Sequence, residues 1–253
     1  MDAETYIKSI IAKYALTGGR TPAATAAAQG VYKIIQSWAG SYLLDVFYSG
    51  SSAKGTAIAG IADVDLFISL KPETPGTLAY IYNNLANYNG FKYLSPKRQN
   101  VSVGIKYNGH SIDLVPGRKQ SGNTTDHSLY RSKANTWTQT NVTKHINLIQ
   151  NSQRLDEIRA LKIWRALHGL DFPSFYLEMT VLDALHGKKV GSVASNVWAV
   201  FEYLRDNFVT AVVIDPVNSN NKLSDDLIVT EKKLISQKAA TCLKAPNWNQ
   251  ILW

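Results

Sequence analysis

The spacing of apolar residues along the chain predicts helices at both ends and strands in between. Apolar residues recur at helical spacing over residues 5–16 and 24–39. After Gly40 the chain turns to short segments rich in β-branched and aromatic residues and bounded by Gly, Pro or Asn, which is typical of strands. The predicted strands are Leu43–Tyr48, Val64–Leu70, Val101–Tyr107 and Ser111–Val115. The pair Asn108-Gly109 between the last two indicates a hairpin turn.

The helical period returns near residue 153. Two helices are predicted there, broken at Gly169 and Pro173, and a third covers Val193–Phe208. The polar stretch 121–150 fits neither period. We therefore expect an α+β protein: a mixed sheet with flanking helices over residues 1–120, a helical domain over 121–253, and a ligand in a cleft between them.

Composition narrows the class of partner. The chain has 253 residues, 45% of them hydrophobic, which is enough for a sizeable core. Its formal charge of +8 favours polyanions such as nucleoside triphosphates or RNA, although an excess of lysine also describes an ordinary solvated surface. The single cysteine, Cys242, excludes an internal disulfide framework and a cysteine zinc site. With no leader-like N-terminus and no apolar run of membrane-spanning length, a cytoplasmic protein without a membrane partner is expected.

A segment of small and hydroxyl-bearing residues follows the first predicted strand. Gly50 and Ser51 open it, at a position where a helix is expected to begin. Backbone N–H groups and serine hydroxyls at such a start suit phosphate oxygens. The segment is not a Walker A loop, because Lys54 precedes Gly55 instead of following it. An ordinary Gly/Ser turn remains the alternative.

Two acids open the next predicted strand. Asp63 and Asp65 are separated by one apolar residue, so they point to the same face of the strand, roughly 7 Å apart. Two carboxylates this close repel each other unless a cation lies between them. Oxygen ligands without a cysteine or histidine cluster select a hard ion, Mg²⁺ or Mn²⁺.

A third acid, Asp113, interrupts the apolar strand Ser111–Val115. A lone acid in a strand is often an edge or exposed residue. If this strand pairs with Val64–Leu70, however, Asp113 lies against Asp63 and Asp65. Three carboxylates on adjacent strands form the usual ligand set of a two-metal site.

Together these residues resemble the polymerase-β-like nucleotidyltransferase superfamily, whose pattern is Gly-Ser, a spacer, Asp-x-Asp on one strand and a later third Asp. The run Gly50–Ile58 leading into Asp63 and Asp65 resembles the branch of 2′-5′-oligoadenylate synthetases, bacterial CD-NTases and archaeal-type CCA-adding enzymes. Position 62 is Ala where that branch often has Ser, a change that should not affect metal binding.

The helical half resembles the same branch. The family's spine-helix pattern implies that Lys162 contacts the triphosphate, and its Ser-aromatic-x-Leu-Glu motif implies that Ser174 binds phosphate and Phe175 stacks on a base. The stretch beginning at Asp215 is similar to the family's Asp-Pro…Asn loop. Taken alone, Lys162 could be a solvated lysine, Phe175 a core residue and Asp215 the start of a turn. The five histidines show no metal-ligand spacing, and no role is expected for them.

The resemblance implies an enzyme that transfers a nucleoside monophosphate from a triphosphate, ATP first among them, to a hydroxyl with release of pyrophosphate. One metal would be held by Asp63, Asp65 and Asp113, and a second by Asp63 and Asp65, with Gly50, Ser51, Lys162, Ser174 and Phe175 binding the nucleotide. The favoured product is a cyclic or linear oligonucleotide messenger. One alternative is template-independent extension of an RNA 3′ end, and another is a catalytically silent nucleotide sensor.

Overall fold

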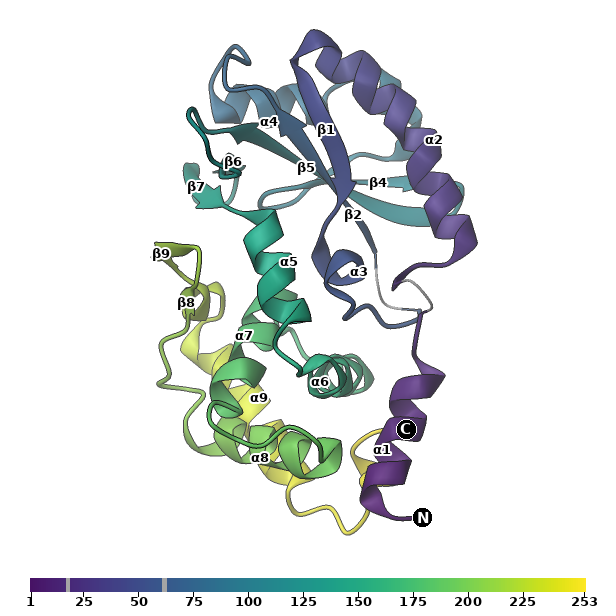
Figure 1. Cartoon of the computed structure of the whole chain (residues 1–253), viewed down its shortest axis with the longest axis vertical. Helices are drawn as coiled ribbons and strands as arrows, with labels where there is room; N and C mark the ends of the chain where they lie inside the picture. Colours follow the sequence, from purple (N-terminus) through teal and green to yellow (C-terminus); the bar gives the residue numbers. More distant parts are fainter. Residues whose placement is uncertain (17–18, 61–62) are drawn as a thin grey trace. The chain divides into compact units, whose positions relative to one another are not determined.

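The computed structural model describes residues 1–16, 19–60 and 63–253, which form two compact units. The sheet unit comprises the described residues 19–54 and 63–146, and the helical unit comprises 1–16, 55–60 and 147–253 (Figure 1). Both units are therefore discontinuous in sequence. In particular, residues 55–60 belong to the helical unit, whereas the chain on either side of them belongs to the sheet unit.

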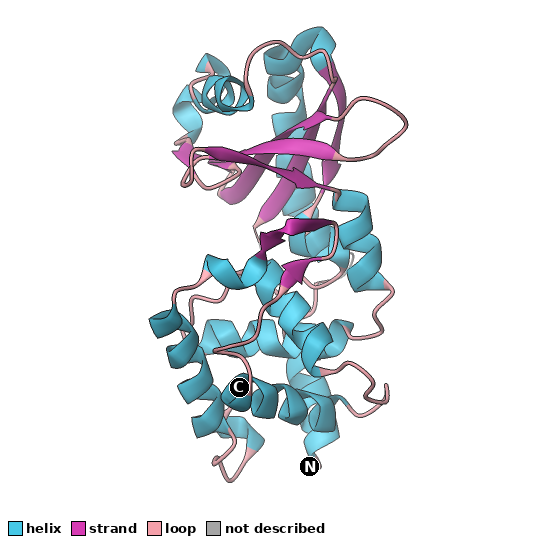
Figure 2. Cartoon of the chain, turned by 90° about the vertical axis from the view of Figure 1, so that its left-hand side faces the viewer, coloured by secondary structure: helices cyan, strands magenta, loops and turns pink. Residues whose placement is uncertain are grey.

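The sheet unit is built on one mixed sheet (Figure 2). Its strands are β1 (Leu43–Tyr48), β2 (Val64–Leu70), β3 (Lys97–Arg98), β4 (Val103–Tyr107), β5 (His110–Lys119), β6 (His127–Arg131) and β7 (Thr136–Thr140). The order is β1-β2-β5-β4-β3, and β6 joins β7 to β5. The β2–β5 pair is parallel, and the other recorded pairs are antiparallel.

The pleat of β2 divides the sheet into two chemically different faces. Val64, Leu66 and Ile68 are buried in the core beneath α2 (Pro22–Ala39) and α4 (Leu78–Ala86). Since successive side chains of a strand point to opposite faces, Asp65 points to the face that these helices do not cover. The unit also contains α3 (Gly50–Lys54) and two short 3₁₀ helices, η2 (Gly40–Tyr42) and η3 (Asn89–Leu94).

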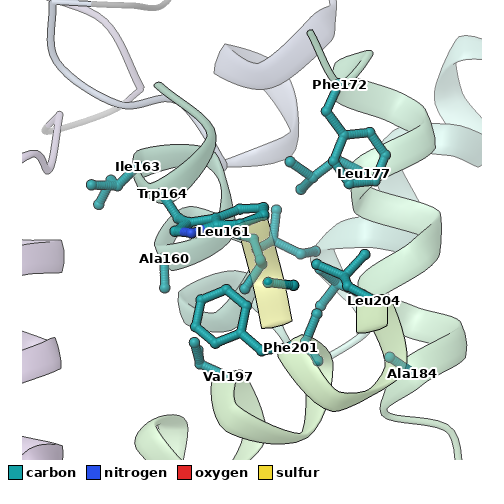
Figure 3. Packing of buried hydrophobic residues seen from close by; sticks show 14 of the residues in the cluster. Ala160, Leu161, Ile163, Trp164, Phe172, Leu177, Ala184, Val197, Phe201 and Leu204 are labelled. Atoms are coloured by element: carbon teal, nitrogen blue, oxygen red, sulfur yellow. The ribbon is translucent and has the colours of Figure 1, made fainter. Parts of the chain in front are cut away.

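The helical unit packs around a separate apolar core (Figure 3). Its elements are α1 (Ala3–Lys13), α6 (Leu155–Leu167), α7 (Ser174–Ala184), α8 (Val193–Asp206), α9 (Val229–Cys242), the 3₁₀ helices η4 (Leu223–Asp226) and η5 (Trp248–Gln250), and the strand pair β8 (Ile214–Asp215) and β9 (Asn218–Lys222). Helix α5 (Val142–Gln150) runs from the sheet unit into the helical unit. Trp164 is fully buried at the centre, with its ring 5.2 Å from that of Phe201.

The predicted fold class is confirmed: a mixed sheet with flanking helices and a C-terminal helical part. The compact units differ from the division expected at residue 120. Helix α1 packs with the helical unit, because its buried isoleucines join that core. Residues 121–146 belong to the sheet unit, because β6 pairs with β5. Within the described ranges, no helix combines the length and apolar character needed to cross a membrane.

Candidate functional site

The central feature of the sheet unit is a pair of aspartates in register on two parallel strands. Asp65 on β2 and Asp113 on β5 are directly paired residues, so their side chains leave the same face of the sheet. This confirms the strand pairing on which the grouping of Asp113 depended. Asp63 lies just before β2 and is exposed, whereas Asp65 and Asp113 are half-buried.

Burial and a neighbouring charge make the ionised form of Asp113 less favourable. Burial raises the pKa of Asp113, the charge of Asp63 raises it further, and a hydrogen bond from Gln99 opposes both effects. Partial desolvation also raises the pKa of Asp63. Both ionised carboxylates are thus less favourable in the folded protein than in water. A divalent cation would offset this cost.

Gln99 fixes the orientation of Asp113. Its Nε2 donates to Asp113 Oδ1 at 2.9 Å, while Ser102 Oγ donates to Gln99 Oε1 at 2.7 Å. Opposite Asp113, Gly104 leaves the space that this arrangement needs, because a Cβ there would lie 2.9 Å from Gln99 Nε2 and 3.0 Å from Asp113 Oδ1. Sequence reasoning missed Gln99 and Gly104, since neither belongs to a motif.

Gly50 and Asp65 are in close contact. Gly50 has φ of +57°, and a Cβ on it would lie 1.8 Å from Asp65 Oδ2. Ser49 N donates to Asp65 O at 2.9 Å, which ties the turn before α3 to β2. Ser51 follows on α3, half-buried, and its hydroxyl has no hydrogen-bond partner among the described residues. The predicted Gly-Ser segment therefore lies beside the predicted metal ligands.

Arg20 adds a positive charge next to this segment. Its guanidinium lies 3.6 Å from the ring centre of Tyr48 and donates from Nη1 to Ser52 Oγ at 2.6 Å. The stacking and the hydrogen bond hold the chain ahead of α2 against α3. No sequence motif indicated this residue.

The carboxylates of Asp63, Asp65 and Asp113 suit a hard divalent ion. Their arrangement in this structure does not by itself form a coordination site. Across 1–16, 19–60 and 63–253, no three His, Cys, Asp or Glu side chains are arranged so that they could hold a metal ion. The chemistry nevertheless fits: Asp65 and Asp113 lie on the adjacent inner strands β2 and β5, Asp63 lies just before β2, and the backbone of Gly50 makes room for the Asp65 carboxylate.

Lys162 has an unexpected environment in the helical unit. It is 2% exposed, and its Nζ donates to Glu178 Oε1 at 2.6 Å and to Thr56 Oγ1 at 2.8 Å. Thr56 Oγ1 in turn donates to Glu178 Oε1 at 2.9 Å. Lys162 is thus neither the solvated lysine of the alternative interpretation nor exposed to a ligand in this structure. Its contact with a triphosphate stays a prediction.

This buried network anchors residues 55–60. Arg159 donates to Gly55 O from Nε at 3.0 Å and from Nη2 at 2.7 Å. Ala59 N donates to Tyr14 O at 2.8 Å. The helical unit therefore holds residues 55–60, which follow α3 in the sequence.

Ser174 and Phe175 begin α7. Ser174 is exposed, and its Oγ accepts a hydrogen bond of 2.9 Å from Arg165 Nη1. The same Nη1 donates to Phe172 O at 2.7 Å. Phe175 is half-buried and packs against the core of the helical unit, so part of its ring serves the core. Their roles at phosphate and base stay predictions.

Two of the remaining residues considered from the sequence, Asp215 and Cys242, are buried. Asp215 is buried, and its carboxylate accepts from Val217 N at 3.0 Å and Asn221 Nδ2 at 3.2 Å, which confirms that it begins a turn. Cys242 is buried beside Trp164 Nε1. Ala62, where the resembled branch often has Ser, lies outside the described residues.

No family model and no curated protein matches the amino-acid sequence. The structure, by contrast, resembles solved structures over nearly its whole length. Escherichia coli MS115-1 CdnC, solved with ATP, has a TM-score of 0.74 at 19% identity, covering 98% of this chain and 96% of that one.

Two further structures give the same result. The CD-NTase CdnG of Bradyrhizobium diazoefficiens, in complex with GTP, has a TM-score of 0.73 at 12% identity over 96% of this chain and 90% of that one. The cyclic dinucleotide synthase CdnE of Elizabethkingia meningoseptica, with GTP and Apcpp, has a TM-score of 0.66 at 14% identity over 97% and 100%. The chain therefore has the fold of the bacterial CD-NTases, which belong to the polymerase-β-like nucleotidyltransferase superfamily.

Proposed function

We propose that this protein is a metal-dependent nucleotidyltransferase, which moves a nucleoside monophosphate from a nucleoside triphosphate to a hydroxyl and releases pyrophosphate. The observation that carries the proposal is the register of Asp65 with Asp113, with Asp63 two residues before Asp65. A purely structural sheet has no need of a half-buried acid, Asp113, whose pKa is raised by burial and by the charge of Asp63.

The three aspartates would hold Mg²⁺ or Mn²⁺. When bound, such ions make a hydroxyl more acidic and neutralise charge on phosphate oxygens. Among the chain's own groups, Gln99 keeps Asp113 in one orientation by donating to Oδ1. Gly50 lets the carboxylate of Asp65 lie against the backbone ahead of α3. We also assign to Asp113 the acceptance of the proton of the attacking hydroxyl.

The remaining nucleotide contacts come from hydroxyl and aromatic groups. The hydroxyl of Ser51 has no partner among the described residues, so its O–H can donate a hydrogen bond to a phosphate oxygen. Ser174 has an exposed hydroxyl at the start of α7, and Phe175, the next residue, has a half-buried aromatic ring. We assign the phosphates to the two serines and the base to Phe175.

The favoured acceptor is a second nucleotide, so that the product is a cyclic or linear oligonucleotide. The solved structures of similar fold support this choice: one is described as a cyclic dinucleotide synthase with GTP and Apcpp, and others contain ATP or GTP. At 12–19% identity these likenesses support the reaction class and leave the bases open.

An RNA 3′ end is the second candidate acceptor. It is favoured by the distribution of charge, because nearly all of the excess of Lys and Arg over Asp and Glu falls in the sequence of the sheet unit. Phosphate backbones are attracted to such a surface. The third alternative, a silent sensor, is disfavoured because the chain has all three acids together with Gly50 and Gln99, which hold two of them in place.

Analysis of the reaction products distinguishes these three functions. The purified protein is incubated with Mg²⁺ or Mn²⁺ and each triphosphate, with and without tRNA, and the products are resolved by mass. Nucleotide dimers or trimers formed without RNA support the messenger function. Nucleotides added to the tRNA, with no free nucleotide dimers or trimers, support 3′-end extension. A protein that binds triphosphate and forms neither product, with either metal, is a sensor.

A further inference from the structure

Helix α6 directs two cations toward α7, and the structure gives them different partners. Lys162 is enclosed with Glu178 and Thr56, and its side chain is 2% exposed. Arg165, three residues further along the helix, is half-buried and reaches the start of α7. The two residues therefore differ in their access to an anion.

Arg165 also retains unused donors. A guanidinium has five N–H groups in a planar fork. Nη1 is bound to Phe172 O and Ser174 Oγ, whereas Nε and Nη2 donate to no described residue. Neither atom is a buried donor lacking a partner. Both are therefore exposed to water or to a ligand.

The hydrogen bond between Arg165 and Ser174 orients the serine. Because Ser174 Oγ accepts from Arg165 Nη1, its own O–H points elsewhere and is free to donate. Ser174 is exposed, so this hydroxyl and the guanidinium fork present donors at one place on the surface of the helical unit. A fork next to a hydroxyl matches the tetrahedral oxygens of a phosphate.

The local balance of charge agrees. Glu178 is within 2.6 Å of Lys162 Nζ, so its carboxylate is compensated inside the core. The acid that remains near Arg165 is the exposed Asp171. Water screens an exposed carboxylate, which leaves Arg165 able to attract a phosphate.

We propose that Arg165, together with Ser174, binds the terminal phosphates of the nucleoside triphosphate. This inference rests on the proposed nucleotidyltransferase function. It adds Arg165 to the phosphate-binding residues that the sequence suggested.

The test compares Arg165→Gln and Arg165→Lys with Arg205→Gln. Arg205 is a matched control, since it is an exposed arginine on α8 of the same unit and pairs with its neighbour Asp206. For each protein, calorimetry measures the Kd of the α,β-methylene analogue of the triphosphate that the wild type consumes fastest, and of the corresponding monophosphate, with Mg²⁺ present. The ratio of the two Kd values does not depend on the fraction of protein that is folded.

Arg165→Gln should raise the Kd of the triphosphate analogue by about 10- to 100-fold, the range for a lost charge-assisted hydrogen bond. The Kd of the monophosphate should stay within about twofold of its wild-type value, because the monophosphate lacks the terminal phosphates. Arg165→Lys keeps the charge and loses the planar fork. Its Kd for the triphosphate analogue should therefore lie between those of the wild type and Arg165→Gln. Arg205→Gln should match the wild type.

The outcomes distinguish this inference from the function on which it rests. A wild type that turns over triphosphate, with Arg165→Gln binding the analogue within twofold of it, overturns the role of Arg165 alone. An equal loss of affinity for the triphosphate analogue and for the monophosphate also overturns it, because such a loss indicates a general structural effect. A wild type that neither binds nor turns over any triphosphate overturns the proposed function and this inference together.

Discussion

The carboxylate of Asp65 occupies the space that a side chain on Gly50 would need: a Cβ there would lie 1.8 Å from Asp65 Oδ2. Gly50 also has a φ of +57°, in the left-handed region that favours glycine. Steric space and backbone conformation therefore both require glycine at the turn that precedes α3.

Gly50→Ala should lower kcat by about 100-fold or more, since an added Cβ displaces a predicted metal ligand, and a misplacement of about 1 Å costs a catalytic group about that much. Gly40→Ala is the matched control. Gly40 has a φ of +55° and nothing within 4 Å of its Cβ position, so it reproduces the backbone strain without the clash. Steady-state rates and melting temperatures of both variants decide the matter. If the two lose equal activity, the contact between Gly50 and Asp65 has no role in the reaction.

Asp113→Asn should stabilise the metal-free protein at pH 7 while removing its activity. Burial and the charge of Asp63 raise the pKa of Asp113, so its ionised form is unfavourable in the folded state. For an acid whose pKa is raised by folding, stability is greatest below the unfolded pKa, near 3.9, and is lost as the pH rises through the folded value. The neutral Asn avoids that loss, and we expect a gain on the order of 1 kcal/mol.

Urea unfolding in EDTA, from pH 7 down to pH 4, measures this difference. The advantage of Asp113→Asn should shrink as the pH falls, because the wild-type carboxyl becomes protonated. Saturating Mg²⁺ should stabilise the wild type more than the variant. A variant that is less stable than the wild type at pH 7 would show that the ionised Asp113 is favourable in the fold, contrary to this account.

Lys162→Met should destabilise the protein by about 3–5 kcal/mol, because it leaves the 1%-exposed carboxylate of Glu178 without its cation. Glu178→Gln should also be costly, as it leaves a buried ammonium. The double variant should cost less than the sum of the two single ones, because no isolated charge remains. Unfolding free energies of the four proteins complete the cycle. Additive costs would mean that the two residues do not interact.

The sequence predicted the fold and the sheet half of the candidate site well, for physical reasons. The apolar run Val64–Leu70 predicted the strand that contains Asp65, and Asn108-Gly109 predicted the hairpin that aligns Asp113. The strands Leu43–Tyr48 and Val64–Leu70 have the predicted bounds. These features are local, so a short stretch of sequence contains them.

Features that depend on distant partners could not be predicted. Gln99 matters because the chain folds back to place it on Asp113, and the burial of Lys162 depends on Thr56, which lies 106 residues away. Helix α4, by contrast, was missed although Thr77 caps its start and its buried residues Ile81 and Leu85 lie at helical spacing. The polar run 121–150 gave no sign of β6 and β7, whose side chains are mostly half-exposed.

The most direct test of the central claim is pyrophosphate release from nucleoside triphosphates with Mg²⁺ or Mn²⁺ by wild type, Asp65→Asn, Asp113→Asn and Asp45→Asn. Asp45 is an exposed acid on β1 of the same sheet and serves as the control. The account predicts that Asp65→Asn and Asp113→Asn lower the rate by about 10²- to 10⁴-fold, that Asp45→Asn leaves it unchanged, and that EDTA abolishes it. Rates for Asp65→Asn and Asp113→Asn within a few-fold of wild type would contradict it.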